Sequence, residues 1–486
     1  MIPRLDETQE LPQTVRVSGY RRADHGVGIV HIGLGAFHKA HQAAYTDDAL
    51  AEFGGDWRIA GISLRSDAPS RELQPQDGLY TLIERDVSGS RARVIGSVAT
   101  AFCLQTDRHA VEEALLAPGT RIVSMTVTEK GYGLDRSTGS IDPEHPAIRS
   151  DLLQPDAPQG LAGLLVWALG QRRTLGLPPF TCLSCDNLPE NGAVLRGLLV
   201  DFARHAAPDL VDHIAQDVAF PGTMVDRITP ARTQDTLDLA RRMIGFQDDA
   251  AIETEGFHQW VIEDHFPTGR PRWEAGGAIF TDDVQPYETM KLRMLNGTHS
   301  MLAYAGFAAG HRYVRDVMAD PDLARLVSRH LSAAAATLPP LPGVDFANYA
   351  KQLEERFRNP HLAHETFQIT MDGSEKLPQR VFAAVSEARA MGCDTRPFAF
   401  ATAAWLRHIS RSTHDCAPYD LRDPRADALT DMARGKDAHE VVTAIRAAPF
   451  MPQAVTWDDA FWNEVTDILH AMLTRPMTEV IAQETT

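Results

Sequence analysis

Three polar residues of one predicted helix could together oxidise an alcohol. Lys291, Asn296 and His299 follow Pro286 in a segment with helical periodicity. At about 100° per residue, Lys291 and His299 lie roughly 80° apart around the helix axis, and Asn296 lies about 60° beyond His299. One face of the helix therefore carries an amine, an amide and an imidazole.

These groups suit alcohol oxidation without a metal. A base must take the hydroxyl proton as hydride leaves the carbon, and a lysine can do this when burial or a cationic neighbour lowers its pKa. Asn296 and His299 can donate hydrogen bonds to the developing alkoxide or to the carbonyl oxygen. The alternative is a solvated Lys291, a capping Asn296 and a core His299. The predicted domain junction favours the first interpretation, because substrate clefts tend to form there.

The dipeptide Asn296-Gly297 complicates the helix prediction. Asn-Gly usually signals a turn, which argues against a helix at this point. If the helix continues, Gly297 costs about 1 kcal/mol relative to alanine. Close approach of a ligand or of another backbone would justify that cost.

A glycine-rich turn near the N-terminus predicts a dinucleotide site. It follows a predicted strand over residues 28–33 and opens a predicted helix over residues 38–53. The first glycine permits a tight turn, the second lets the backbone approach a pyrophosphate, and the helix N-terminus offers free N–H groups. A histidine replaces the third glycine of the usual fingerprint, so a tight turn without a ligand is the alternative. The predicted cofactor residues are Gly33, Gly35, Ala36, Phe37 and His38.

The end of the second predicted strand, residues 57–64, leaves the choice of cofactor open. The acidic residue that usually reads the ribose is missing from its simplest position. Asp67 could hold the ribose hydroxyls, whereas Arg65 could meet a 2′-phosphate or stack on adenine. Both NAD and NADP remain compatible with these residues.

Composition excludes several classes of function. The chain has 486 residues, 47 of them basic and 65 acidic, with a formal net charge of −18. So acidic a chain is a poor ligand for nucleic acid and for anionic membranes. Its polar start lacks the apolar core of a signal peptide, and its five scattered cysteines form no disulfide framework. We therefore predict a soluble, cytoplasmic protein with a small-molecule partner; the oligomeric state stays open.

No metal site is predicted. Cys182 and Cys185 resemble a redox pair, but they lie in a predicted strand, and no second pair completes a zinc site. His38 and His41 have a chelating spacing, but no third ligand is near in sequence.

The order of predicted elements divides the chain near Pro286. Before it, short apolar strands alternate with helical segments, which is typical of a parallel α/β sheet. After it, the patterns are long and 3.6-periodic, with few strand candidates. We predict an α/β, Rossmann-type NAD(P)-binding domain with insertions over residues 1–285. A mainly α-helical substrate or catalytic domain is predicted over residues 286–486.

Nearly the whole chain resembles the mannitol dehydrogenase family, the polyol-specific long-chain dehydrogenases and reductases. The matching segments are residues 33–41, 127–132, 184–192, 220–227, 259–264, 291–299 and 372–380. The resemblance implies a Rossmann-type N-terminal domain and a helical C-terminal domain with the site between them. It also implies zinc-independent chemistry with NAD(P), NAD being favoured.

The resemblance also implies residue roles. Lys291 becomes the general base, and Asn296 and His299 stabilise the oxyanion. Arg227 could be a substrate clamp or part of a local ion pair. The implied substrate-binding residues are Asn187, Asp226, Arg227, Glu288 and Lys376, and Lys130 joins the cofactor site.

The substrate is narrowed by residues 368–380, which look most like those of fructuronate reductases (D-mannonate oxidoreductases). Two departures weaken that likeness: this chain has His258 where those reductases often have arginine, and it lacks the arginines often found at Ala363 and Glu365. We favour D-mannonate and D-fructuronate over mannitol and fructose or another polyol. A catalytically silent nucleotide-binding sensor is the remote alternative, but a sensor has no need of a base.

Six basic residues of the matching segments decide between the two substrate classes. If they converge, the acidic protein carries a positive pocket suited to a sugar acid; otherwise a neutral polyol fits better. They are Lys130, Arg227, Lys291, Arg293, Lys376 and Arg380.

Overall fold

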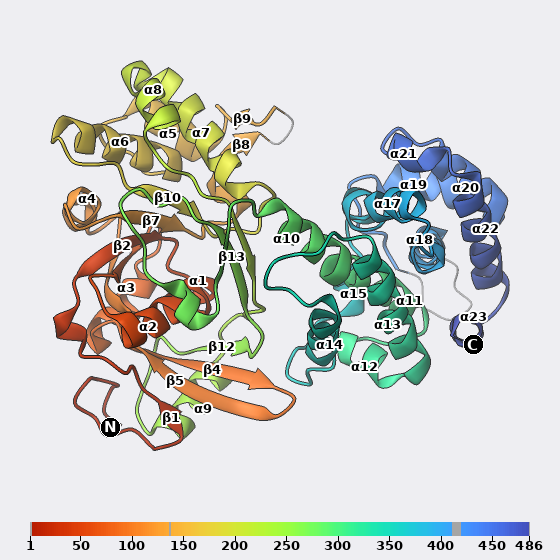
Figure 1. Ribbon diagram of the computed structural model, residues 1–486, viewed down its shortest axis with the longest axis horizontal. Coiled ribbons are helices and arrows are strands. Elements are labelled where there is room, and N and C mark those ends of the chain that lie inside the picture. Colours follow the sequence, from red (N-terminus) through yellow and green to blue (C-terminus); the bar gives the residue numbers. More distant parts are fainter. Residues whose placement is uncertain (1, 136–137, 411–418, 486) are drawn as a thin grey trace. The chain divides into compact units, whose positions relative to one another are not determined.

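The computed structural model describes residues 2–135, 138–410 and 419–485 (Figure 1). The chain divides into two compact units, Met1–Gln285 and Pro286–Thr486. The first is an α/β unit and the second is helical, as the sequence predicts. No helix in the described part of the chain combines the length and the apolar character needed to cross a membrane.

A five-stranded parallel sheet forms the centre of the first unit. Its order is β10-β7-β2-β3-β6. From β2 the chain builds outward to β3 and β6, then returns to build β7 and β10 on the other side. In such sheets ligands bind at the carboxyl ends of the strands, where the order reverses. The strands are β2 (Val27–Ile32), β3 (Arg58–Ser63), β6 (Val98–Cys103), β7 (Ile122–Met125) and β10 (Thr181–Ser184).

Helices cover both faces of this sheet (Figure 1). Ile29 and Val30 are consecutive in β2, and they belong to separate buried cores, because successive side chains of a strand point to opposite faces. The long apolar strands of the sequence follow from burial on both sides. The helices of the whole unit are α1 (Ala36–Ala40), α2 (Gln42–Phe53), α3 (Ala68–Leu73), α4 (Arg108–Leu116), α5 (Pro146–Leu153), α6 (Leu161–Thr174), α7 (Asn191–Ala206), α8 (Val211–Gln216) and α9 (Gln234–Ile244).

Three smaller sheets complete the unit. The strands β4 (Tyr80–Asp86) and β5 (Gly89–Ile95) form an antiparallel hairpin. It pairs with β1 (Val15–Arg16) and β12 (Ile252–Glu255). A further sheet contains β11 (Thr223–Asp226), β13 (Gln259–Glu263) and β14 (Ile279–Thr281), and β8 (Leu134–Asp135) pairs with β9 (Ser140–Ile141).

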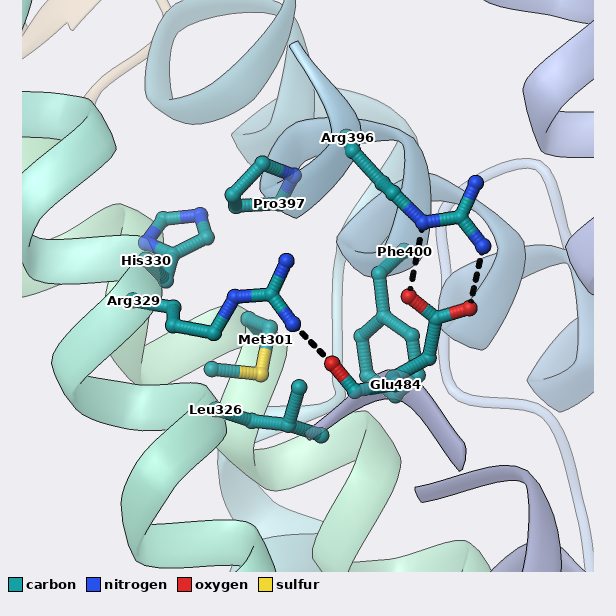
Figure 2. A pocket seen from close by; sticks show the side chains of 8 residues that line it. All are labelled: Met301, Leu326, Arg329, His330, Arg396, Pro397, Phe400 and Glu484. Atoms are coloured by element: carbon teal, nitrogen blue, oxygen red, sulfur yellow. Dashed lines mark hydrogen bonds and ion pairs between the residues drawn. The ribbon is translucent and has the colours of Figure 1, made fainter. Parts of the chain in front are cut away.

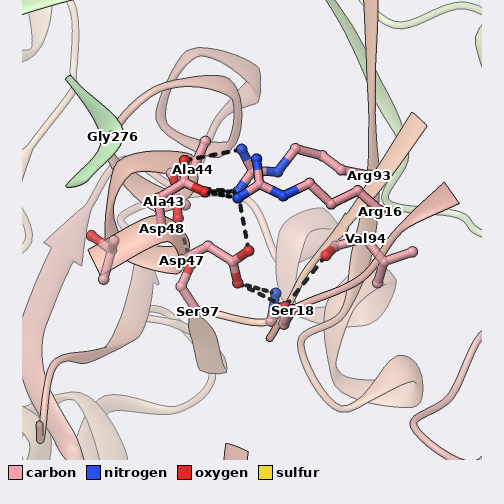
Figure 3. Close-up of polar contacts among 12 residues, drawn as sticks. Arg16, Ser18, Ala43, Ala44, Asp47, Asp48, Arg93, Val94, Ser97 and Gly276 are labelled. Carbon is pink, nitrogen blue, oxygen red and sulfur yellow. Dashed lines mark hydrogen bonds and ion pairs between the residues drawn. The ribbon is translucent and has the colours of Figure 1, made fainter. Parts of the chain in front are cut away.

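A buried ion cluster joins α2 to this hairpin (Figure 3). The Arg93 guanidinium on β5 lies 3.1 Å from the Asp47 carboxylate and 2.9 Å from the Asp48 carboxylate, both on α2. The second oxygen of Asp47 accepts from the Ser18 hydroxyl at 2.8 Å. Removing one partner of such a buried set leaves the other charge uncompensated.

The second unit is built from helices packed around α18 (Arg396–Ser410), most of whose residues are buried. The other helices are α10 (Gln285–Met290), α11 (Thr298–Ala308), α12 (Val314–Ala319), α13 (Pro321–Ala336), α14 (Phe346–Phe357), α15 (Thr366–Ile369), α16 (Gly373–Leu377), α17 (Ala383–Met391), α19 (Ala426–Ala433), α20 (Ala438–Arg446), α21 (Gln453–Thr456), α22 (Asp459–Thr474) and α23 (Met477–Glu484). Two π-helical segments, η6 (Lys291–Gly297) and η7 (Pro378–Phe382), interrupt the α-helical pattern.

Helix α23 is fastened to the rest of this unit beside a small cavity (Figure 2). The Glu484 carboxylate accepts two hydrogen bonds from Arg396, at 2.9 and 2.6 Å, and its carbonyl oxygen accepts one from Arg329. The cavity is also lined by His330, whose Nδ1 lies 2.9 Å from the Thr298 hydroxyl.

Candidate active site

The predicted cofactor turn has the backbone that a dinucleotide requires. Gly33 has a φ of +98°, and a Cβ there would lie 2.1 Å from the carbonyl oxygen of Thr126, so only glycine fits. A Cβ on Gly35 would instead meet nothing nearer than the Gly33 carbonyl oxygen at 3.8 Å. The exposed Gly35 therefore leaves room for a phosphate before α1 begins at Ala36. The turn fits a pyrophosphate.

The His38 side chain lies in the core and not at the predicted cofactor site. The ring is fully buried and stacks on His31, with 3.5 Å between the ring centroids. Burial lowers the pKa of His38 well below its usual value, so the ring is neutral. Neither ring nitrogen has a hydrogen-bond partner among the described residues. The side chain belongs to the core, and a phosphate contact by His38 is left to its backbone N–H.

The predicted helix over residues 38–53 is two helices. They meet at His41, whose backbone leaves the helical region with φ −113° and ψ −96°. Phe37 stacks on the His41 ring at 5.0 Å, and His41 Nε2 lies 3.1 Å from the Gln259 carbonyl oxygen. The residues after the turn are thus held by aromatic packing within the first unit.

Arg65 and Asp67 follow β3 at the same edge of the sheet as the glycine turn, because the carboxyl ends of parallel strands share one edge. Arg65 is exposed. Asp67 is the N-cap residue of α3, and its carboxylate lies 3.2 Å from Arg71. Both residues are therefore placed where adenosine would lie in a Rossmann domain.

Asp186 organises the loop after β7, and sequence reasoning missed this role. Its carboxylate accepts hydrogen bonds from the backbone N–H groups of Val127 and Thr128, both at 3.1 Å, and from the Tyr132 hydroxyl at 2.8 Å. Burial raises the pKa of Asp186. Thr128 has a φ of +64°, an uncommon conformation for a β-branched residue. An aspartate directly after a strand and before Asn187 was the available signal.

The predicted residues next to Asp186 and Thr128 lie on the surface of the first unit. Asn187 follows Asp186 at the carboxyl end of β10 and is exposed. Lys130, two residues after Thr128, is exposed as well. The ends of β7 and β10 therefore carry these two side chains at the edge that holds Gly33.

Of the two alternatives for Arg227, the structure favours the local ion pair. Its guanidinium lies 2.5 Å from the Glu84 carboxylate and donates to the backbone carbonyls of Ala40 and Glu255. The Arg227 side chain is almost fully buried. Asp226 is the last residue of β11 and is buried beside it.

The predicted catalytic helix is continuous but not regular. It runs through α10, η6 and α11 without the turn that Asn-Gly suggested. Lys291 opens the π-helical segment η6 and is 9% exposed. Because π-helical hydrogen bonds join residues i and i+5, Lys291 and Asn296 lie one turn apart on the same face. In a regular α-helix they would be about 140° apart.

A neighbouring backbone segment leaves no room for a side chain at Gly297. A Cβ there would lie 2.7 Å from the carbonyl oxygen of Arg380, which belongs to the second π-helical segment, η7. It would also lie 3.4 Å from His330. Of the two reasons offered for a glycine here, the structure therefore shows the approach of a backbone.

The side chains of Asn296 and His299 are partly buried. The Asn296 amide oxygen has no hydrogen-bond partner among the described residues. His299 stacks on Phe357 at 4.8 Å and meets the edge of His364 at 5.2 Å. Burial first, and then the nearby positive charges, lower the pKa of His299 well below its usual value. The neutral imidazole carries one donor and one acceptor.

Within the second unit, the predicted basic residues converge only in part. Lys376 donates to the Met371 carbonyl oxygen at 2.7 Å and lies 3.4 Å from Asp372. Burial, followed by the charge of Arg380, lowers the pKa of Lys376. Arg293 instead forms a bidentate ion pair with Glu387 at 2.6 Å.

Glu288, the remaining predicted substrate residue, lies on α10 and is partly buried, three residues before Lys291. No group of three or more His, Cys, Asp or Glu side chains within the described ranges is arranged to hold a metal ion.

Comparison with known proteins identifies both units. The family model described as the mannitol dehydrogenase Rossmann domain matches residues 27–275, and the mannitol dehydrogenase C-terminal domain matches residues 283–473. D-mannonate oxidoreductase of Escherichia coli (strain K12) is 42% identical over 401 residues, 82% of each chain.

Two solved structures are similar over almost the full length. Substrate-free D-sorbitol dehydrogenase has a TM-score of 0.92 at 32% identity, covering 99% of this chain and 100% of its own. Pseudomonas fluorescens mannitol 2-dehydrogenase, in a ternary complex with NAD and D-mannitol, has a TM-score of 0.79 at 35% identity, covering 99% of both. The Rossmann domain confirms the expected dinucleotide cofactor. This chain is an oxidoreductase that belongs to the mannitol dehydrogenase family.

Proposed function

We propose that this enzyme interconverts D-mannonate and D-fructuronate by NAD-dependent, metal-independent hydride transfer. The observation that carries the proposal is that Lys291 and Asn296 lie one turn apart in η6, with His299 on the first turn of α11 near further positive charge. The 42% identical D-mannonate oxidoreductase supports the choice of substrate.

The cofactor site is assigned to the first unit. Gly33 and Gly35 give the backbone room for the pyrophosphate, and the N–H groups of Ala36, Phe37 and His38 face it. Asp67 and Arg65 contact the adenosine part, and Lys130 lies on the loop after β7. Bound NAD accepts hydride from the alcohol carbon, and its reduced form returns hydride to the ketone.

The chain supplies the proton chemistry. Lys291 takes the hydroxyl proton during oxidation and returns it during reduction. Asn296 and the neutral His299 donate hydrogen bonds to the substrate oxygen as negative charge develops on it. Each such donor contributes a factor of about 10²–10³ to the rate in comparable sites. Asn187, Asp226, Glu288 and Lys376 hold the hydroxyls of the substrate.

A panel of keto substrates tests the proposal. Reduction of D-fructuronate, D-tagaturonate, D-fructose and D-xylulose is followed as loss of NADH or NADPH absorbance. We expect the highest kcat/KM with D-fructuronate and NADH. Cofactor binding without turnover of any substrate in the panel would contradict the proposed function and favour a nucleotide sensor.

Mannitol and fructose form the second candidate pair. Mannitol 2-dehydrogenase of Pseudomonas fluorescens is 35% identical to this chain over nearly its whole length. An arginine at position 365 would favour a sugar acid. This chain has Glu365 there, paired with Arg312 at 2.7 Å. A higher kcat/KM for D-fructose than for D-fructuronate would select this candidate.

A further inference from the structure

Arg380 differs from two other arginines of the same unit in its polar partners. Its guanidinium is partly buried, and burial lowers its pKa. Its one hydrogen bond within the described ranges is donated by Nη1 to the Ser300 hydroxyl, at 3.2 Å, and no described carboxylate forms an ion pair with it. Arg293 and Arg396, in the same unit, each form two hydrogen bonds to one carboxylate.

Most N–H donors of the Arg380 guanidinium therefore have no acceptor among the described residues. A guanidinium has five N–H donors in a planar fork, which matches the two oxygens of a carboxylate. Burying such a charge is costly unless an anion accompanies it. Asp372, the nearby acid, lies 3.4 Å from Lys376. An anionic ligand would therefore complete the surroundings of Arg380.

The position of Arg380 ties that ligand to the proposed chemistry. The Ser300 hydroxyl that accepts from Arg380 donates in turn to the Asn296 carbonyl oxygen at 3.1 Å. The charge of Arg380 also acts on His299 and on Lys376. A molecule bound by Asn296 and His299 would thus have Arg380 as a neighbouring cation.

We propose that Arg380 binds the carboxylate of a sugar-acid substrate and so sets the preference for keto acids over neutral ketoses. This inference rests on the proposed dehydrogenase function. Arg380 would supply positive charge in a chain that lacks the arginines often found in fructuronate reductases at the positions of Ala363 and Glu365. The competing explanation is structural: Arg380 fastens η7 to α11 through Ser300.

D-Fructuronate and D-fructose separate the two explanations, because they share the reacting ketone and differ in carrying a carboxylate or a hydroxymethyl group at C6. The Arg380→Gln variant should lose about 10- to 100-fold in kcat/KM for D-fructuronate, as expected for a hydrogen bond to a charged group. For D-fructose the change should stay within about threefold, and the loss should appear mainly in KM, because the carboxylate lies away from the reacting carbon.

The control is Arg325→Gln, which removes the same charge from an exposed position of the same unit. It should leave the ratio of the two kcat/KM values unchanged. Binding of NADH, followed by fluorescence, should be the same in wild type and both variants. Equal losses for D-fructuronate and D-fructose in Arg380→Gln would overturn the proposal and support the structural explanation.

Three further outcomes are decisive. If Arg380→Gln does not fold, Arg380→Lys takes its place, because lysine keeps the charge and lacks the planar set of donors. The proposal then requires a selective loss of kcat/KM for D-fructuronate. An equal loss for D-fructuronate and D-fructose, or no loss, contradicts it. If the wild-type enzyme reduces D-fructose better than D-fructuronate, the inference on Arg380 fails while the dehydrogenase function stands. If it reduces neither and no other ketose or keto acid, the proposed function itself fails.

Discussion

The carbonyl oxygen of Arg380 lies 2.7 Å from the place that a Cβ on residue 297 would occupy. Two π-helical segments, η6 and η7, therefore meet backbone to backbone at Gly297. The residues assigned to the chemistry stand on η6 and on the first turn of α11, so their positions depend on this contact.

The Gly297→Ala variant should test that dependence. The added methyl favours a helix by about 1 kcal/mol, but overpacking against the Arg380 carbonyl should cost about 1–3 kcal/mol. We expect a lower free energy of unfolding in urea and a lower kcat. Gly197→Ala on α7 is the control: its Cβ would meet no atom within 4 Å, and it should stabilise the protein by about 0.4–1 kcal/mol. Equal stabilisation by both changes would show that the contact is loose.

The Lys291→Ala variant should separate catalysis from cofactor binding. Loss of the base should lower kcat by about 10²–10⁴-fold. The affinity for NADH, measured by fluorescence titration, should not change, because the glycine turn lies in the other unit. Lys351→Ala, at an exposed position of α14, should retain full activity. Normal turnover by Lys291→Ala would refute the assignment of the base.

Buried neutral histidines should make stability fall in mild acid. Burial lowers the pKa of His31 and of His41 to about 3 and that of His330 to about 4. The unfolded chain binds these protons near pH 6.5, so the stabilisation is present above that pH and is lost as the pH falls below it. Three such groups give a slope of up to about 4 kcal/mol per pH unit. Urea unfolding at pH 7.5, 6.5 and 5.5 measures this; higher stability at pH 5.5 than at pH 6.5 would contradict it.

Two arginines contact the Asp48 carboxylate, and we expect their removal to destabilise the protein by different amounts. Arg93→Met leaves Asp47 and Asp48 without their buried partner and should destabilise the protein by about 3–5 kcal/mol. Arg16 also lies 2.5 Å from Asp48, but its side chain is 63% exposed. Arg16→Met should therefore cost no more than about 1 kcal/mol. Thermal or urea unfolding compares the two, and similar losses would show that burial is not what distinguishes them.

Local patterns were enough to predict the glycine turn and the Lys291 helix. A strand, a tight turn and a helix follow one another within twenty residues, so periodicity and glycine chemistry determine the outcome there. The mainly helical second unit followed from its long 3.6-periodic segments.

Contacts between distant segments decided the rest. The backbone of Arg380 approaches η6 at Gly297, although it lies far along the chain and leaves no mark on the periodicity around Lys291. Glu84, which pairs with Arg227, is equally remote in sequence. His38 replaces a glycine of a cofactor motif, and only the stacking on His31 reveals that its ring belongs to the core.

The π-helical segment also bears on how the chain tolerates changes in length. A π-helical turn holds one residue more than an α-helical turn. The extra residue between Lys291 and Asn296 is thus absorbed within the helix, while α11 keeps its packing on α18. We expect a one-residue deletion inside η6 to restore a regular helix and preserve the fold, with the amine and the amide then four residues and about 40° apart. The π-helical turn thus lets this segment hold one extra residue while the amine and the amide stay on one face of the helix.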